Sequence, residues 1–281
     1  MLRPPPRVAL ERERWETPDG DFIDVDFAGP ATGRRLVLFH GLEGCSDSHY
    51  ARAIAAHASR RGWHVAIPHW RGCSGEPNRK PRAYHSGDTA EVDWIVRKLD
   101  PECAIGISLG GNALLKWLGQ HGEAVRLKRA AAVSAPIDLP AAGRALDRGL
   151  NRLLYTKHFL ATLKPKSLAK LETFPGIYDA AKVRAARTFR EFDNVVTAPL
   201  HGFRDVDHYW SEAASGPWLA KIRVPTLLLN ARNDPFLPEH ALLAAARDAA
   251  PCVLLEFPRS GGHVGFRHAW LAQRLLEFLD P

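Results

Sequence analysis

The sequence predicts an α/β fold, in which a mostly parallel, doubly wound sheet carries helices on both faces. Short apolar runs typical of buried strands alternate along the chain with segments of helical periodicity. One stretch, residues 139–215, has no strand pattern, is helical in character and is too long for a simple loop. We therefore expect a helical cap inserted over the carboxyl edge of the sheet.

Six apolar runs bounded by turn residues predict buried strands. They lie at residues 36–40, 63–70, 103–107, 129–135, 225–231 and 253–257. Residues 22–27 alternate apolar and acidic side chains, which favours an antiparallel strand at one edge of the sheet.

Helical patterns follow most of these strands. After the first strand, small and apolar residues from Ala51 to Ala58 recur at the spacing of one helix face. Asp88 is expected to cap the next helix, and Glu91, three residues later, completes a signal resembling a capping box. Further helices are expected from residue 109 onward and over residues 238–249 and 267–279.

The composition indicates a folded protein that does not bind nucleic acid. Apolar residues make up 46% and charged residues 25% of the chain, as in ordinary globular proteins. The formal charge is +7, but there is no block of Lys and Arg and no zinc-finger, homeodomain or RNA-binding signature. A solvated basic surface accounts for this charge, and we expect no nucleic-acid partner.

The cysteines and the amino terminus indicate the compartment. The four cysteines form no C-x-x-C pair and suggest no disulfide framework. The first 16 residues lack the apolar stretch of a secretory signal, and no run approaches the roughly 18 apolar residues of a membrane span. We expect a soluble cytoplasmic protein with reduced thiols, whose surface leaves room for peripheral membrane contact. No feature of the sequence indicates an oligomeric state.

Residues 106–110 read Gly-Ile-Ser-Leu-Gly, a G-x-S-x-G motif between a predicted strand and a predicted helix. In that context the motif forms a sharp turn that lifts the serine hydroxyl above the sheet, as in the α/β-hydrolase fold. Gly106 and Gly110 leave room for the strained backbone of Ser108. The motif therefore predicts that Ser108 is the nucleophile of a serine hydrolase.

A serine hydroxyl needs an adjacent base, and in this fold the chain order is nucleophile, acid, histidine. His263, in a glycine-rich loop between the last strand and the last helix, is the expected base. Asp234, just after the strand at 225–231, is the expected acid, which would orient the imidazole. His268 is the next candidate base but falls within the last helix, and Asp138 is a competing acid because it follows the strand at 129–135.

A tetrahedral intermediate also needs hydrogen-bond donors for its oxyanion. The backbone N–H groups of Leu109, after the nucleophile, and of Leu42, in the loop at 40–44, are expected to supply them. His40 is expected to orient this loop by hydrogen bonding, and Glu43 is expected to have a structural role.

Other chemical groups in the sequence have weaker patterns. Cys73 and Ser74 could form a nucleophile pair, but no strand-to-helix turn follows them. His201, Asp205 and His208 lack the dense spacing of a zinc site. No phosphate-binding or dinucleotide-binding glycine motif is present. We expect no metal and no cofactor.

The motifs together resemble the YheT family of α/β-hydrolases. The likeness rests on HGLEG, HWRGCSGEPNR with AYHSGDT, GISLGGN, ARNDPF and GGHVGF, and it spans residues 34–279. The resemblance implies a Ser-Asp-His triad on Ser108, Asp234 and His263. It also implies carboxylesterase, acylglycerol-lipase or acyltransferase-like activity, since the family includes eukaryotic relatives that act on lipid esters.

These observations divide the chain into a first core part (1–138), a helical cap (139–215) and a second core part (216–281). We expect hydrolysis of a small-molecule carboxylic ester through an acyl-enzyme. The aromatic-rich cap suggests a lipophilic acyl group, as in short- or medium-chain esters or acylglycerols. The 12 basic and 8 acidic residues of the cap suit either an anionic headgroup or a solvated surface. An acyltransferase or thioesterase with the same triad, and a non-catalytic ligand-binding protein, remain as alternatives.

Overall fold

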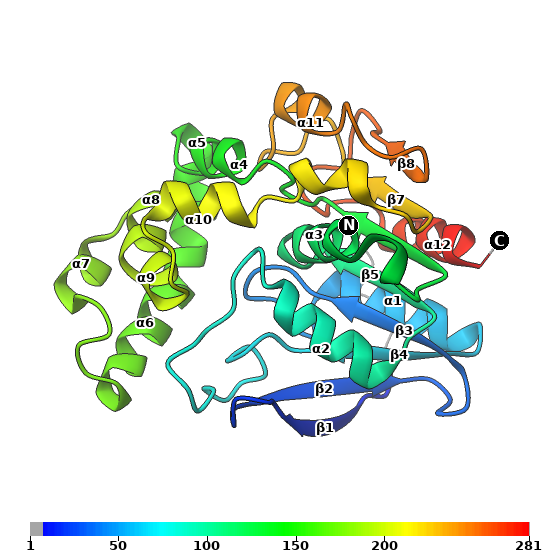
Figure 1. Cartoon of the computed structure of the whole chain (residues 1–281), viewed down its shortest axis with the longest axis horizontal. Helices are drawn as coiled ribbons and strands as arrows, with labels where there is room; N and C mark the ends of the chain where they lie inside the picture. The colour runs from blue at the N-terminus through cyan, green and yellow to red at the C-terminus, as the bar shows by residue number, and fades with distance from the viewer. Residues whose placement is uncertain (1–7, 281) are drawn as a thin grey trace.

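The computed structural model describes residues 8–280 and contains an eight-stranded sheet (Figure 1). Residues 1–7 lie outside this range; they are part of the amino-terminal segment in which the sequence predicts no secretory signal. The strands are β1 (Glu11–Glu16), β2 (Phe22–Ala28), β3 (Arg34–Phe39), β4 (Trp63–Pro68), β5 (Cys103–Ile107), β6 (Arg129–Val133), β7 (Thr226–Leu229) and β8 (Val253–Glu256).

The strand order is β1-β2-β4-β3-β5-β6-β7-β8, and all pairs from β4 to β8 are parallel. The mostly parallel sheet and the six strands expected from apolar runs are therefore confirmed. The carboxyl ends of these parallel strands meet at one edge of the sheet, where this class of fold binds its ligands.

Strand β2 is antiparallel to β4, as expected, but its predicted place at the edge of the sheet is wrong. Strand β1, which the sequence did not indicate, pairs with β2 and forms the edge instead. Its sequence ERERWE is mostly charged, and only Trp15 in it is buried. Ion pairs replace the apolar pattern, since Arg12 contacts Asp26 at 2.7 Å and Arg14 contacts Asp24 at 2.8 Å.

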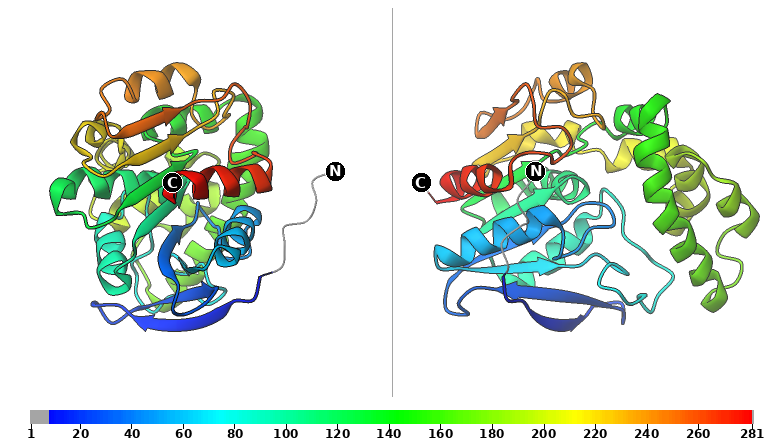
Figure 2. Two further views of the ribbon diagram at one scale, coloured as in Figure 1. Left: turned by 90° about the vertical axis from the view of Figure 1, so that its right-hand side faces the viewer. Right: turned by 180° about the vertical axis from the view of Figure 1, so that it is seen from behind.

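Alternate side chains of the strands build two apolar layers, one on each face of the sheet. In β3, for example, Leu36 and Leu38 face one layer, whereas Val37 and Phe39 face the other. Two helices, α1 (His49–Arg60) and α12 (His268–Leu279), cover the first face. The opposite face carries α2 (Thr89–Leu99), α3 (Leu109–His121) and α11 (Glu239–Ala245) (Figure 2, left).

The capping box expected at the start of α2 does not form, although Asp88 occupies the N-cap position. The Asp88 carboxylate instead accepts a hydrogen bond from Arg82 at 2.6 Å, and Glu91 accepts one from Arg71 at 2.8 Å. Charge-assisted bonds to guanidinium groups are stronger than bonds to backbone amides, so both carboxylates turn toward the arginines.

Residues 139–213 are helical and lie beyond the carboxyl edge of the sheet, on the left in Figure 1. The segments are α4 (Leu139–Leu146), α5 (Gly149–Asn151), η2 (Arg152–Thr156), α6 (Lys157–Thr173), α7 (Ala180–Ala185), α8 (Phe189–Phe192), η3 (Asp193–Thr197), α9 (Ala198–Leu200) and α10 (Val206–Ala213). Two short 3₁₀ helices, η1 (Gly122–Ala124) and η4 (Gly216–Lys221), lie in the core. We refer to residues 139–215 as the cap.

Within residues 8–280, no helix combines the length and the apolar character needed to cross a membrane.

A buried ionic network fixes the long loop between β4 and α2. Arg71 donates hydrogen bonds to Asp21 at 3.0 Å, to Glu91 at 2.8 Å and to Asp19 at 2.8 Å. Arg71, Asp21 and Glu91 are buried, so each charge depends on its partners for solvation. The network links the turn between β1 and β2 to α2, and it positions the loop that borders the cap.

We expect Arg71→Met to lower the free energy of unfolding by about 3 to 5 kcal/mol, because it removes the guanidinium that bonds the buried carboxylates of both Asp21 and Glu91. Urea unfolding followed by circular dichroism measures the change. The control is Arg97→Met, which removes an exposed i,i+4 pair with Asp93 and should cost at most about 0.5 kcal/mol. Equal losses in the two variants would contradict this account of the network.

Candidate active site

Ser108 lies at the turn between β5 and α3, at the carboxyl edge of the sheet. Its backbone has φ of +52°, a conformation that is strained for a residue with a side chain. The turn is tight, since a Cβ on Gly106 would lie 2.5 Å from the carbonyl oxygen of Gly110. A Cβ on Gly110 would lie equally close to the carbonyl oxygen of Phe39. Only glycine fits at these two positions, and the turn directs the serine hydroxyl away from the strand.

The ring of His263 lies between the side chains of Ser108 and Asp234. Its Nε2 atom is 2.9 Å from the Ser108 Oγ atom, and its Nδ1 atom is 3.0 Å from the nearer Asp234 oxygen. These distances suit a neutral imidazole that donates from Nδ1 to the carboxylate and accepts the serine proton at Nε2. Along the chain, His263 is 155 positions from Ser108 and 29 positions from Asp234, yet the three side chains meet at one point.

Three residues that the sequence analysis did not identify orient this histidine. The Asn233 side-chain oxygen accepts hydrogen bonds from the N–H groups of Gly261 and Gly262, at 3.0 and 2.9 Å, and fixes the histidine loop. The hydroxyl of Ser134, at the end of β6, accepts a bond from the N–H of the residue after the histidine. The Phe236 ring stacks on the imidazole of His263 with centroids 3.7 Å apart.

The competing acid and base lie elsewhere. The Asp138 carboxylate caps α4 and accepts a hydrogen bond from the N–H of Ala141 at 2.9 Å. His268 is the first residue of α12, where its ring packs against that of His49. Neither side chain forms a hydrogen bond with Ser108 or His263 among residues 8–280.

The loop at 40–44 lies beside the serine, since a Cβ on Gly41 would be 3.2 Å from the Ser108 Cβ. His40 is fully buried and orients the loop. It accepts a bond from the Trp70 N–H at Nε2, and its Nδ1 atom is 2.7 Å from the Gly41 oxygen. Burial lowers the pKa of His40 to about 3, which keeps the ring neutral.

Leu42 and Leu109 line the same cavity as Ser108, and their backbone N–H groups are the expected oxyanion donors. Neither group donates a hydrogen bond to any other group in residues 8–280, whereas the Gly41 and Glu43 N–H groups donate to tyrosine hydroxyls. Two unpaired backbone donors beside a serine could stabilise a negatively charged oxygen.

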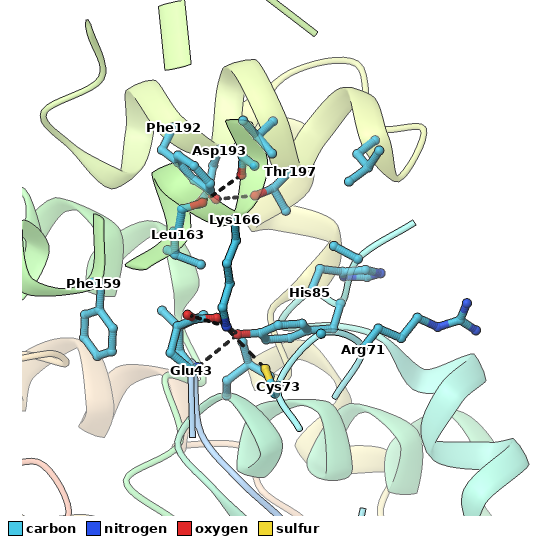
Figure 3. A pocket seen from close by; sticks show the side chains of 18 of the residues that line it. Glu43, Arg71, Cys73, His85, Phe159, Leu163, Lys166, Phe192, Asp193 and Thr197 are labelled. Carbon is cyan, nitrogen blue, oxygen red and sulfur yellow. Dashed lines mark hydrogen bonds and ion pairs between the residues drawn. The ribbon is translucent and has the colours of Figure 1, made fainter. Parts of the chain in front are cut away.

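Glu43 connects this loop to the cap. Its carboxylate accepts a hydrogen bond from the Tyr84 hydroxyl at 2.9 Å and pairs with Lys166 of α6 at 2.8 Å. Figure 3 shows the Lys166 side chain extending from the cap to Glu43. The backbone of Glu43 has φ of +54°, so these contacts maintain a strained loop. The expected structural role of Glu43 thus includes a direct contact with the cap.

A cavity of about 1050 Å³ lies between the core and the cap and includes Ser108 in its wall. Most of its cap side is apolar and aromatic. Examples are Leu146, Phe159, Leu163, Phe189, Phe192 and Trp210. Phe236, which stacks on the imidazole of His263, also borders the cavity. Such a cavity can enclose a lipophilic chain that ends at the serine hydroxyl.

A carboxyl group lies among the apolar side chains of the cap wall. Asp193 lies in the cap end of the cavity, away from Glu43 (Figure 3). It accepts hydrogen bonds from the Thr197 hydroxyl at 2.6 Å and from the Trp210 indole N–H at 2.8 Å. Burial raises the pKa of Asp193 to about 6. The sequence analysis did not identify this residue, because a single acid in a helical segment carries no signal of its own.

The alternative nucleophile at Cys73 and the alternative metal ligands at His201, Asp205 and His208 lie in surroundings that do not suit those roles. Burial raises the pKa of the Cys73 thiol to about 12, which disfavours the thiolate that a nucleophile requires. Asp205 caps α10 by accepting a hydrogen bond from the His208 N–H at 2.8 Å, whereas His201 packs against His85. Within residues 8–280, no three or more His, Cys, Asp or Glu side chains are grouped to bind a metal ion.

Comparisons with known proteins identify the family of the chain. Residues 34–267 match the family described as alpha/beta hydrolase fold. The chain is 38% identical to "Putative esterase YheT" of Escherichia coli (strain K12), over 95% of this chain and 84% of that protein. It is 30% identical to "Phospholipase ABHD3" of Mus musculus, over 95% of this chain and 69% of that protein. It is 28% identical to "Monoacylglycerol lipase" of Saccharomyces cerevisiae, over 95% of this chain and 63% of that protein.

Solved structures share the fold at low identity. An esterase from Exiguobacterium antarcticum superposes with a TM-score of 0.63 at 17% identity, covering 95% of this chain and 99% of that chain. The thioesterase domain from the curacin biosynthetic pathway superposes with a TM-score of 0.62 at 17% identity, covering 96% and 99%. At these identities the similarity concerns the fold alone.

Two half-buried histidines, His85 and His201, border the cavity beside the β4–α2 loop. The rings of His85 and His201 pack with centroids 4.6 Å apart, and the Nε2 atom of His201 has no hydrogen-bond partner among residues 8–280. Burial lowers the pKa of each to about 3. An unfolded chain takes up a proton on each histidine near pH 6.5, and the folded chain does not until about pH 3. Stability should therefore fall as the pH decreases through this window.

We expect His201→Gln to reduce the loss of stability between pH 6.5 and 4, because the variant no longer has a histidine that only the unfolded state protonates. The slope of unfolding free energy against pH should decrease by up to about 1.4 kcal/mol per pH unit. Urea unfolding at several pH values measures both slopes, and an exposed histidine variant, His240→Gln, serves as control. Identical slopes for wild type and His201→Gln would contradict the prediction.

Proposed function

The chain belongs to the α/β-hydrolase family, and we propose that it hydrolyses lipophilic carboxylic esters with Ser108, His263 and Asp234 as its catalytic triad. The assignment as a carboxylic ester hydrolase rests on relatives named as an esterase, a phospholipase and a monoacylglycerol lipase. The observation that carries the mechanism is the continuous hydrogen-bonded chain from the Ser108 hydroxyl through His263 to Asp234.

In the first step, His263 Nε2 takes the proton of the Ser108 hydroxyl as the oxygen attacks the ester carbonyl. The C–O π bond opens and places negative charge on the former carbonyl oxygen. The N–H groups of Leu42 and Leu109 then donate hydrogen bonds to that oxyanion. Asp234 stabilises the imidazolium through Nδ1 and fixes the ring orientation.

In the second step, the tetrahedral intermediate collapses and expels the alcohol, which receives its proton from His263 Nε2. The acyl group is now an ester of Ser108. Water enters, loses a proton to His263 and attacks the acyl carbon. Collapse of this second intermediate releases the carboxylic acid and returns the proton to Ser108.

The cavity wall supports a lipophilic acyl group as substrate. The aromatic and aliphatic side chains of the cap enclose a volume of about 1050 Å³ that reaches Ser108. Burying an acyl chain there removes apolar surface from water, which favours binding by about 0.8 kcal/mol for each methylene group. We propose that residues 139–215 act as a cap that shapes this acyl site, between core parts at 1–138 and 216–281.

We expect Ser108→Ala to abolish p-nitrophenyl butyrate hydrolysis and labelling by a fluorophosphonate, because the variant lacks the attacking oxygen. The fold should be retained, as shown by an unchanged circular dichroism spectrum. Spectrophotometry and intact-protein mass spectrometry measure turnover and labelling. Ser74→Ala, in the loop with the alternative nucleophile pair, is the matched control and should keep wild-type rates. Labelling of Ser108→Ala at the wild-type rate would show that another residue is the nucleophile.

We expect Asp234→Asn to lower kcat by about 10⁴-fold, since an amide favours the wrong imidazole tautomer. Asp138→Asn should leave kcat within a few-fold of wild type, because asparagine also caps a helix. Steady-state kinetics on one soluble ester compares the two variants. A larger loss of activity in Asp138→Asn than in Asp234→Asn would assign the acid to Asp138.

A further inference from the structure

Three leucines of the cap are exposed to solvent and lie on one face of a helical segment. Leu150, Leu153 and Leu154 are 73%, 58% and 61% exposed. Their spacing of i, i+3 and i+4 on α5 and η2 places them side by side. A single exposed leucine is ordinary on a protein surface, but a contiguous cluster marks an interaction site. We call these three residues the leucine patch.

Positive charge surrounds the leucine patch. Residues 144–168 contain six Lys and Arg and one acid, Asp147; one of the six, Lys166, pairs with Glu43, which leaves five other basic side chains. The Asp147 carboxylate accepts hydrogen bonds from the N–H groups of Phe189 and Arg190, and its single negative charge leaves the basic side chains in excess. A groove of about 680 Å³ beside Leu153 is lined by no acid and by three of these basic residues, Arg152, Lys157 and Lys164. Two further basic residues, Arg184 and Arg187, also line it.

The opposite face of the same segment contacts the candidate active site. The Asn151 side chain donates a hydrogen bond to the carbonyl oxygen of Pro235 at 2.7 Å, next to the proposed acid. The Tyr155 ring packs edge-on against Phe236, which stacks on the imidazole of His263. The rod formed by α5, η2 and α6 faces the viewer in the right-hand view of Figure 2. One helix thickness therefore separates the leucine patch from the site.

We propose that the leucine patch inserts into the surface of an anionic lipid bilayer while the surrounding lysines and arginines contact the lipid headgroups. Apolar side chains flanked by cations are the chemistry that such an interface binds. A second copy of the chain fits less well, because a symmetric contact would place the same basic side chains against one another. This inference rests on the proposed function only in one respect, which is that the membrane would present the lipophilic ester to the enzyme. Binding of the chain to vesicles can be measured without any ester hydrolysis.

The test is sedimentation of the full chain with large vesicles of phosphatidylcholine alone or mixed with 30% phosphatidylglycerol. Wild type should bind the mixed vesicles at least tenfold more tightly than the neutral ones. The variant Leu150→Ser/Leu153→Ser/Leu154→Ser should lose at least tenfold in affinity for the mixed vesicles. The variant Arg148→Gln/Arg152→Gln should lose most of the preference for anionic lipid.

The matched control is Leu254→Ser/Leu255→Ser on the edge strand β8, where the leucines are 47% and 39% exposed. It should bind vesicles as wild type does. Unchanged p-nitrophenyl butyrate hydrolysis by the triple leucine variant shows that its fold and site are intact. If the wild-type chain binds vesicles but hydrolyses no ester, the proposed function is overturned and the proposed membrane-docking surface is retained.

Two results would overturn the docking surface itself. One is equal binding of mixed vesicles by wild type and the triple leucine variant. The other is absence of vesicle binding together with a dimer, seen by light scattering, that the triple variant loses. That second result would assign the leucine patch to a contact between two copies of the chain.

Discussion

The carboxyl ends of β5, β6, β7 and β8 lie side by side, and the site depends on that arrangement. Ser108 follows β5, Ser134 follows β6, Asp234 follows β7 and His263 follows β8. Parallel pairing therefore brings four separate loops to one edge of the sheet. The imidazole of His263 is the point where they meet, because it contacts the serine and the carboxylate at the same time. A shift of one strand in register would separate these groups.

The sequence was sufficient to predict the parts of the fold that follow local rules. Apolar runs predicted the parallel strands, and the order of Ser108, Asp234 and His263 identified the residues that the structure brings together. Strand β1 was missed because the bonds of Arg12 and Arg14 to acids on β2, rather than an apolar pattern, stabilise it. Asp88 was misread because a guanidinium displaced the backbone amide as its partner. The stacking of Phe236 on the imidazole of His263 was also not predicted, because such a contact depends on tertiary packing, which no local sequence pattern encodes.

The cap and the core are coupled at two places that flank the serine. On one side Lys166 pairs with Glu43, whose neighbour Leu42 carries one of the unpaired N–H groups. On the other side Tyr155 packs against Phe236 beside the histidine. The same cap segments therefore line the cavity that reaches Ser108, contact the loops that carry Leu42 and Phe236, and present exposed leucines to the surroundings. In this account, substrate access and catalytic geometry depend on one helical insertion.

The most direct test of the central claim is a crystal structure of the protein after reaction with a long-chain alkyl fluorophosphonate. The account predicts phosphorus bonded to the Ser108 oxygen and a phosphoryl oxygen about 3 Å from the N–H groups of Leu42 and Leu109. It also predicts the alkyl chain within the cavity under the cap. Phosphorus on a different side chain, or a Ser108 adduct whose phosphoryl oxygen faces solvent, would contradict it.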